Sequence, residues 1–205
     1  LVLLGDSLIQ GWGGPGRSVE AAGAAHWERF FGGRRAGNLG IAGDRVKHVR
    51  WRLEHGVLDG IRPHIVLLLV GTNDLSDGRP AAETAADILA IGQEALARAP
   101  GTRLLIHGIL PRGATGADPL RGEIAAANAL LQSRLGELGP RTTFLDASAA
   151  FLESDGPARP ELFAADFLHL SPAGYAAWGE ALIPHLGTAL PRFADAQRKS
   201  LEPGW

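Results

Sequence analysis

The sequence predicts a three-layer α/β fold, in which a doubly wound parallel β-sheet carries helices on both faces. Short apolar runs of strand length alternate along the chain with longer segments of helical periodicity, and this alternation is typical of a parallel sheet connected through helices. The apolar runs are continuous, as in strands that are covered on both faces. With 205 residues, 45% of them hydrophobic, the chain has the length and core material of a single domain.

The expected strands are the apolar runs themselves. The run at 65–70 is rich in branched residues, and the run at 104–110 ends at Pro111. The five predicted strands cover residues 1–4, 36–39, 65–70, 104–110 and 142–145.

The expected helices lie between these runs. Val46, Val49 and Leu53 recur at helical spacing, and two longer segments are rich in Ala and Leu. In the last helix Ser171 is expected as N-cap, with Pro172 at the first helical position. The predicted helices cover residues 27–31, 44–55, 81–99 and 123–138, and the segment that begins at Ser171. Ligands of such sheets bind beyond the carboxyl ends of the strands, so this edge is the expected site.

Composition excludes several classes of function. The net charge of -2 gives no basic footprint for nucleic acid or for an anionic membrane. The absence of Cys excludes disulfides, thiol catalysis and Cys-based zinc sites. No apolar run reaches the roughly 18 residues that a membrane-spanning helix needs.

The domain organisation is expected to be simple. We predict one domain over residues 1–190 and a peripheral tail over residues 191–205, where periodicity is lost. Residue 1 is not Met and lies inside a predicted strand, so we expect further residues upstream. The compartment therefore stays open, with the cytoplasm slightly favoured over secretion.

Four short motifs follow one another in a fixed order, each at the end of a predicted element. They are Gly5-Asp6-Ser7-Leu8, the segment 38–44 (NLGIAGD), Gly71-Thr72-Asn73-Asp74 and Asp166-Phe167-Leu168-His169. Together they supply a serine, donors for an oxyanion, and a histidine that follows an aspartate by three residues. These are the groups that acyl transfer through a serine ester requires.

Each group has an expected role. Ser7 is the candidate nucleophile, His169 the base that activates it, and Asp166 the carboxylate that orients the imidazole. Gly43, which has no Cβ, lets its N–H approach a ligand closely, and Asn73 ends a buried strand with an amide donor. Taken singly, these residues are better explained as helix caps, a surface charge, a turn glycine and an Asx turn. Their joint occurrence favours the catalytic roles.

The motifs resemble those of the SGNH hydrolase superfamily, also called the GDSL esterases, from residue 1 to about residue 186. The resemblance implies a flavodoxin-like fold, a metal-independent serine esterase without cofactor, and a triad of Ser7, Asp166 and His169. It also implies an oxyanion hole made by the N–H groups of Ser7 and Gly43 and the side chain of Asn73.

A longer resemblance points to the catalytic subunits of intracellular platelet-activating-factor acetylhydrolases. It rests on residues 38–44, 49–56 (VRWRLEHG), 61–63, 71–73, 110–113, 144–146 and 167–171. It implies an acetyl ester as the small-molecule substrate and, by analogy, a homodimer. Two features depart from that group: residues 11–16 look inserted, and Asp74 stands where the group often has Asn. Both departures concern the entrance and the headgroup site.

Three neighbours of the predicted catalytic groups bear on acyl length. Leu8, Thr72 and Leu168 are expected to crowd the acyl side of a bound ester and to limit it to acetyl or butyryl; alternatively, the two leucines are ordinary core residues. Other possibilities stay open: an O-acetylated carbohydrate as substrate, a lysophospholipid or thioester with a longer chain, or a binding module that is not an enzyme.

Other patterns are given a structural interpretation. Residues 11–16 match G-x-G-x-x-G, but Ser7 already occupies the turn after the strand, where a dinucleotide motif would lie. We expect instead a flexible rim in which Trp12 is available for contact. Trp51 and Trp178 are expected in the core, as is His107, and no histidines show the spacing of metal ligands.

Overall fold

The computed structural model describes residues 1–16, 21–154 and 156–186. Over these residues one sheet of five parallel strands has the order β2-β1-β3-β4-β5. The strands are β1 (Val2–Gly5), β2 (Gly37–Gly40), β3 (Ile65–Leu69), β4 (Arg103–His107) and β5 (Thr142–Leu145). This is the strand order of the flavodoxin-like doubly wound sheets, so the predicted fold class is confirmed.

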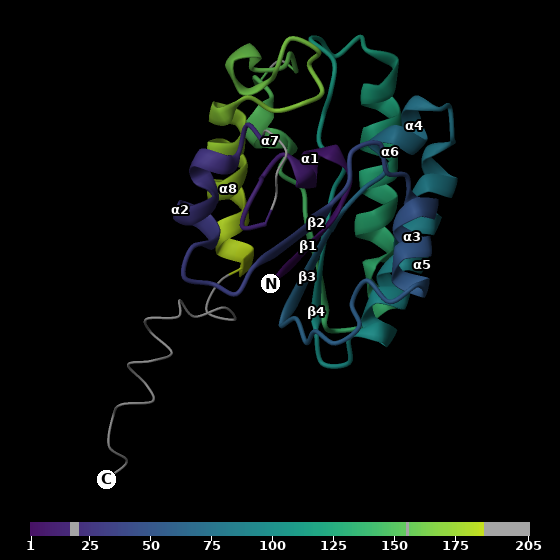
Figure 1. Cartoon of the computed structure of the whole chain (residues 1–205). Coiled ribbons are helices and arrows are strands. Elements are labelled where there is room, and N and C mark those ends of the chain that lie inside the picture. The colour runs from purple at the N-terminus through teal and green to yellow at the C-terminus, as the bar shows by residue number, and fades with distance from the viewer. Residues whose placement is uncertain (17–20, 155, 187–205) are drawn as a thin grey trace.

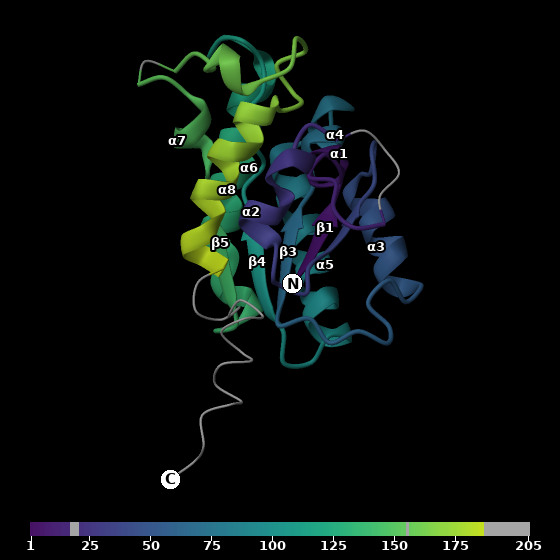
Figure 2. The same cartoon turned by 60° about the vertical axis from the view of Figure 1, so that its left-hand side comes forward.

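Helices cover both faces of the sheet. Figures 1 and 2 show α2 and α8 on one face and α3, α5 and α6 on the other. The α-helices are α1 (Ser7–Gln10), α2 (Trp27–Phe31), α3 (Val46–Glu54), α4 (Thr72–Ser76), α5 (Ala81–Arg98), α6 (Pro119–Arg134), α7 (Ser148–Phe151) and α8 (Pro172–Leu186). Three short 3₁₀ segments are η1 (Ala24–His26), η2 (Leu135–Leu138) and η3 (Pro160–Leu162).

Strand β1 divides the core in two. Successive side chains of a strand point to opposite faces of the sheet. Leu1 and Leu3 accordingly pack in the apolar cluster beneath α2 and α8, whereas Val2 and Leu4 pack in the cluster beneath α3, α5 and α6. A strand buried on both faces explains why the sequence shows a continuous apolar run there.

Several predicted boundaries differ from the structure by one or two residues, and two larger differences have a visible cause. The strand predicted over 104–110 ends at His107, because the backbone N–H and C=O of Ile109 bond to the side chain of Asn128 at 2.8 and 2.9 Å and leave the ladder. The helix predicted over 123–138 begins four residues earlier, at Pro119. There Asp118 is the N-cap and accepts a hydrogen bond from Leu120 N at 2.9 Å.

The predicted exposed position of Trp12 is wrong. The side chain is fully buried, and its ring lies 5.0 Å from Phe31, 4.9 Å from Tyr175 and 5.2 Å from Trp178 between centroids. The Asn38 side chain draws the segment inward, because its Nδ2 donates to Gly13 O at 2.8 Å. A large aromatic ring gains most by burial, so Trp12 belongs to the core beneath α8.

The predictions for the other aromatic residues have different outcomes. Trp178 is fully buried as expected, and its Nε1–H donates to Nε2 of His107 at 2.8 Å. His107 is a core histidine whose pKa burial lowers to about 4, so the ring is neutral. Trp51, in contrast, is 59% exposed, and the prediction that it lies in the core is wrong. It stacks on His55 at 4.0 Å on the outer side of α3.

The described chain ends with α8 at Leu186, and Ser171 accepts a hydrogen bond from Gly174 N at its start, as predicted for an N-cap. The tail predicted over 191–205 lies outside the described residues. Within the described segments, none of the helices has the length and apolarity needed to cross a membrane.

Candidate active site

The four motifs meet at the carboxyl edge of the sheet. Ser7 lies two residues after the end of β1, Gly43 follows β2, and Asn73 lies in α4 after β3. His169 lies between η3 and α8, 162 residues after Ser7 in the sequence. Because β1 pairs with both β2 and β3, the chain reverses its direction of winding at this point, which is where doubly wound sheets bind their ligands.

Ser7 is the first residue of a helix of one turn. Asp6 is the N-cap, and its Oδ1 accepts from Leu8 N at 2.9 Å. Gly5 is required for packing, since a Cβ at this position would lie 1.9 Å from Leu69 O on the neighbouring strand. The tight approach of β1 to β3 and the cap together fix the place of the Ser7 hydroxyl.

Ser7, His169 and Asp166 form a continuous chain of hydrogen bonds. His169 Nε2 lies 3.0 Å from Ser7 Oγ, and His169 Nδ1 lies 2.6 Å from Asp166 Oδ2. A carboxylate can only accept, so Nδ1 carries the proton and Nε2 is left free to accept from the serine hydroxyl. This tautomer is the one in which histidine can serve as a base toward Ser7.

The backbone of the turn at residues 166–169 orients the Asp166 carboxylate. Asp166 Oδ1 accepts from Leu168 N at 3.0 Å and His169 N at 2.9 Å, which leaves Oδ2 for the imidazole. Phe167 adopts a left-handed conformation with φ of 49°, which costs an aromatic residue about 1–3 kcal/mol. Its carbonyl accepts from Gly113 N at 2.8 Å. The strained residue thus lies inside the turn that orients the carboxylate.

The electrostatics of this turn keep Asp166 ionised. Partial burial acts to raise the pKa of the Asp166 carboxyl, but the hydrogen bonds from the His169 imidazole and from the N–H groups of Leu168 and His169 outweigh it, and the net pKa is lowered. The side chains of Asp166 and His169 are 49% and 46% exposed. The pair thus lies open to solvent and substrate.

Residues 41–44, here called the Gly43 loop, run across this edge after β2. Gly43 is exposed and has φ of +81°, a conformation that a side chain would disfavour. Asn73 Nδ2 donates to Asp44 O at 2.9 Å. That bond defines the orientation of the amide and uses one of its two N–H groups, so the second is available to a ligand.

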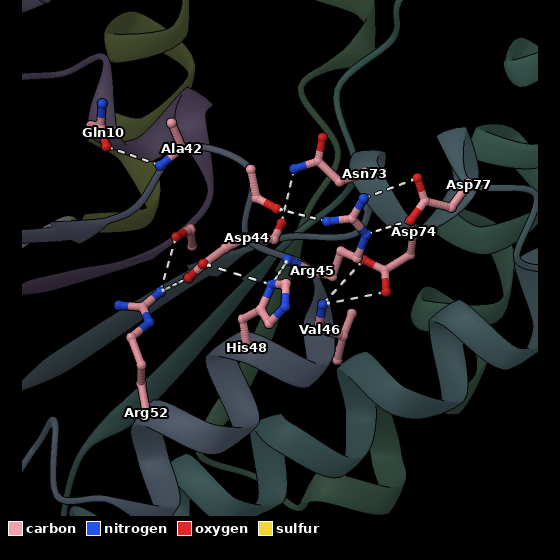
Figure 3. A network of polar contacts seen from close by, with 12 residues as sticks. Gln10, Ala42, Asp44, Arg45, Val46, His48, Arg52, Asn73, Asp74 and Asp77 are labelled. Carbon is pink, nitrogen blue, oxygen red and sulfur yellow. Dashed lines mark hydrogen bonds and ion pairs between the residues drawn. The ribbon is translucent and has the colours of Figure 1, made fainter.

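Figure 3 shows further polar contacts that hold the Gly43 loop, and the motifs did not reveal them. Gln10, from the same helix as Ser7, accepts from Ala42 N at 2.9 Å. Asp74 accepts from Val46 N at 3.1 Å and so caps α3. Asp74 is a position at which the sequence departs from the family that it resembles. Its side chain is nevertheless buried and caps the neighbouring helix. Burial raises the pKa of the Asp74 carboxyl, and the bond from Val46 N opposes that rise.

The three residues predicted to limit acyl length differ in their exposure to solvent. Leu8 and Thr72 are each 1% exposed, and Leu8 packs in the core beneath α2 and α8. Leu168 is half-buried. In the sequence it lies between Asp166, which contacts the imidazole, and His169, which contacts Ser7. Of the three, Leu168 therefore has side-chain surface that a substrate can reach.

Among residues 1–16, 21–154 and 156–186, no group of three or more His, Cys, Asp or Glu side chains could hold a metal ion. Two histidines of α3 and its C-cap, outside the candidate triad, have local partners. His48 accepts from Arg45 N at 3.1 Å at the start of α3, and His55 bonds to Trp51 O at 2.7 Å.

Asp6 gives the site a pH-dependent stability. Burial raises the pKa of its carboxyl from 3.8 to about 7; the bond from Leu8 N opposes the rise, and the charges of Asp44 and Asp74 add to it. The folded state holds the proton more tightly than the unfolded state, so this group's stabilisation is full below pH 4 and is lost as the pH rises toward 7.

We therefore expect Asp6→Asn to flatten the pH profile of stability. Between pH 5 and pH 8 the wild type should lose roughly 2–3 kcal/mol of unfolding free energy that the variant keeps. Urea unfolding at both pH values measures this difference. Asp118→Asn removes the carboxylate of a comparable N-cap that is not enclosed, and so controls for capping; equal pH profiles in wild type and Asp6→Asn would contradict the prediction.

The fold and the arrangement of motifs define an SGNH-type hydrolase. The sequence profile of the GDSL-like Lipase/Acylhydrolase family matches residues 3–177. The chain belongs to this family and is a carboxylic ester hydrolase.

Named relatives agree with this assignment. The chain is 39% identical over 176 residues to platelet-activating factor acetylhydrolase IB subunit alpha1 of Homo sapiens, covering 85% of this chain and 70% of the relative. It is 39% identical over 151 residues to subunit alpha2 of Homo sapiens, covering 73% and 63%. The acetylxylan esterase Axe2 of Geobacillus stearothermophilus shares the fold, with a TM-score of 0.73, 19% identity and coverage of 91% and 93%.

Proposed function

We propose that the protein is a metal-independent serine esterase that hydrolyses acetyl and other short-chain esters through an acyl-enzyme. The observation that carries the proposal is the contact of His169 with both Ser7 Oγ, at 3.0 Å, and Asp166 Oδ2, at 2.6 Å. A serine hydroxyl is a weak nucleophile until a base takes its proton, and a base in this tautomer lies within reach.

The reaction has two halves. In the first, Ser7 Oγ attacks the ester carbonyl while His169 Nε2 takes the serine proton. The tetrahedral intermediate then collapses, the ester C–O bond breaks, and the imidazolium returns the proton to the leaving alcohol. In the second half, water loses a proton to Nε2 and attacks the acyl-enzyme, and Ser7 regains its proton as the acid leaves. Asp166 stays ionised throughout and stabilises the imidazolium.

The negative charge on the intermediate needs donors that are already in place. We assign this role to the N–H groups of Ser7 and Gly43 and to the second N–H of the Asn73 amide. The Asn73 bond to Asp44 O supports the assignment, because it holds the amide beside the Gly43 loop. Donors of this kind contribute about 10²–10³ each in turnover.

The substrate is proposed to be an acetyl ester of a phospholipid-like alcohol. The support is the 39% identity to platelet-activating factor acetylhydrolase subunits over most of the chain. Leu8 and Thr72 then form a closed floor, and Leu168 is the wall against the acyl group.

Hydrolysis of p-nitrophenyl esters with acyl chains from two to twelve carbons tests the proposal. We expect the highest kcat/KM with acetate. An optimum at eight carbons or more would contradict the acetyl substrate and favour a lysophospholipase or thioesterase. No hydrolysis at any length, by folded protein, would favour a binding module. An acetylated lysophospholipid analogue, compared with an acetylated xylo-oligosaccharide at equal acetyl concentration, then separates lipid from carbohydrate alcohols.

Leu168→Ala is expected to relax the limit on acyl length. Removing the isobutyl group opens space beside the ester, so the ratio of kcat/KM for butyrate to that for acetate should rise about tenfold or more, within the roughly 10–200-fold that such pocket changes give. Leu130→Ala, a half-buried leucine of α6, is the matched control and should leave the ratio unchanged. An unchanged ratio in Leu168→Ala would remove this residue from the acyl pocket.

A further inference from the structure

We infer that Arg52 is a positioning residue of the esterase reaction: its guanidinium fixes the Gly43 loop against the strand end that presents Ser7. This inference rests on the proposed function. Arg52 lies in the second half of α3 and belongs to none of the four motifs. Its side chain is only 11% exposed and points back toward the carboxyl edge of the sheet (Figure 3).

The guanidinium joins three separate parts of the site. Nη1 donates to Leu39 O at 2.6 Å, in the strand that leads into the Gly43 loop. Nη2 donates to Asp44 Oδ2 at 2.6 Å, at the end of that loop. Nη2 also donates to Gly5 O at 3.1 Å, two residues before Ser7. One cation therefore holds both ends of the Gly43 loop and the end of β1 in a single frame.

The loop depends on such bonds because apolar packing does not hold it. Ile41, Ala42 and Gly43 are all exposed. The loop is anchored instead by polar contacts: Ile41 N donates to Gly5 O at 3.0 Å, and Asp44 O accepts from Asn73. Gly5 O and Asp44 are the same groups that Arg52 binds. A shift of Arg52 would thus be transmitted to the N–H of Gly43 and to the Asn73 amide together.

The geometry requires a guanidinium, beyond the need for a positive charge. Asp44 is 11% exposed, like Arg52, so the pair is shielded from water and its hydrogen bonds are directional. A planar fork presents donors to several acceptors in fixed directions, whereas a lysine ammonium is a point charge on a flexible stem. Arg50, in the same helix, contrasts with this: its side chain is 43% exposed and lies 3.8 Å from Asp87.

Arg52→Lys is therefore expected to lower kcat for p-nitrophenyl acetate by about 10- to 100-fold, because displacements of about 1 Å at a reacting centre cost about 10²-fold. KM should stay within about twofold, since the donors act on the intermediate more than on the bound ester. The rate of Ser7 labelling by a fluorophosphonate, which also passes through an oxyanion, should fall in parallel. Arg50→Lys, the matched control, should change neither quantity.

Circular dichroism and thermal unfolding give the fraction of each variant that is folded. Kinetic constants are measured well below the melting temperature and are expressed per folded molecule. A loss of kcat that disappears after this correction would reduce Arg52 to a structural ion pair. Values of kcat and labelling rate within twofold of wild type would overturn the inference as well. Failure of the wild type to become labelled at Ser7 would instead contradict the proposed esterase, and this role of Arg52 with it.

Discussion

Ser7→Ala is expected to lower kcat for p-nitrophenyl acetate by on the order of 10⁴- to 10⁶-fold. The variant lacks the oxygen that we propose forms the acyl-enzyme, and His169 Nε2 loses the hydroxyl that lies 3.0 Å away. The donors that we assign to the oxyanion remain, so a small rate above the uncatalysed one should persist. Stability should change little, because the Ser7 side chain is half-buried and the cap of α1 is provided by Asp6.

The measurement is steady-state hydrolysis combined with mass spectrometry of fluorophosphonate-treated protein. Wild type should gain one adduct on the peptide that contains Ser7, and Ser7→Ala should gain none. Ser133→Ala is the matched control, since its hydroxyl lies on the outer side of α6 and bonds to Leu130 O at 3.1 Å. Turnover in Ser7→Ala within tenfold of wild type would refute the serine mechanism and point to a water attacking the ester directly.

The parts of the site that could be predicted from sequence are those that single motifs encode. Ser7 at a strand end, and His169 three residues after Asp166, are local patterns, and the structure brings these three side chains into contact. The sheet could be predicted in the same way, because continuous apolar runs depend only on local composition.

Other features depend on partners that are distant in the sequence. Arg52 belongs to none of the four catalytic-type motifs, and its role depends on three acceptors that come from two strand ends and a loop. Trp12 follows the turn that carries Ser7 and precedes a Gly- and Pro-containing segment, a context typical of a loop. Its burial results from the bond of Asn38 to Gly13 O and from aromatic rings of α2 and α8.

The exposure of Trp51, in contrast, follows from a pattern that the sequence already contains. At about 100° per residue, Val46, Val49 and Leu53 share one side of α3, and Trp51 lies about 140° from Val46. The helical spacing of the buried residues therefore predicts that this tryptophan faces outward, and 59% exposure agrees.

Asp166→Asn is expected to lower kcat by about 10³-fold with little change in KM. The amide can keep its carbonyl oxygen on the N–H groups of Leu168 and His169, which are 3.0 and 2.9 Å from Asp166 Oδ1, so the turn is preserved. Its NH₂ then faces His169 Nδ1 and can only donate. The imidazole is driven to the tautomer with the proton on Nε2, which cannot accept from Ser7.

The size of this effect depends on the openness of the site. In an enclosed triad the corresponding change costs roughly 10⁴-fold; here the Asp166 side chain is 49% exposed, so water can support part of the imidazolium charge. Asp146→Asn is the matched control, because Asp146 accepts a similar bond from Ser148 N at 2.8 Å. The measurement is kcat together with the rate of fluorophosphonate labelling at Ser7, and both should fall. A loss below about fivefold would mean that Asp166 only shapes the turn and that His169 finds its tautomer without it.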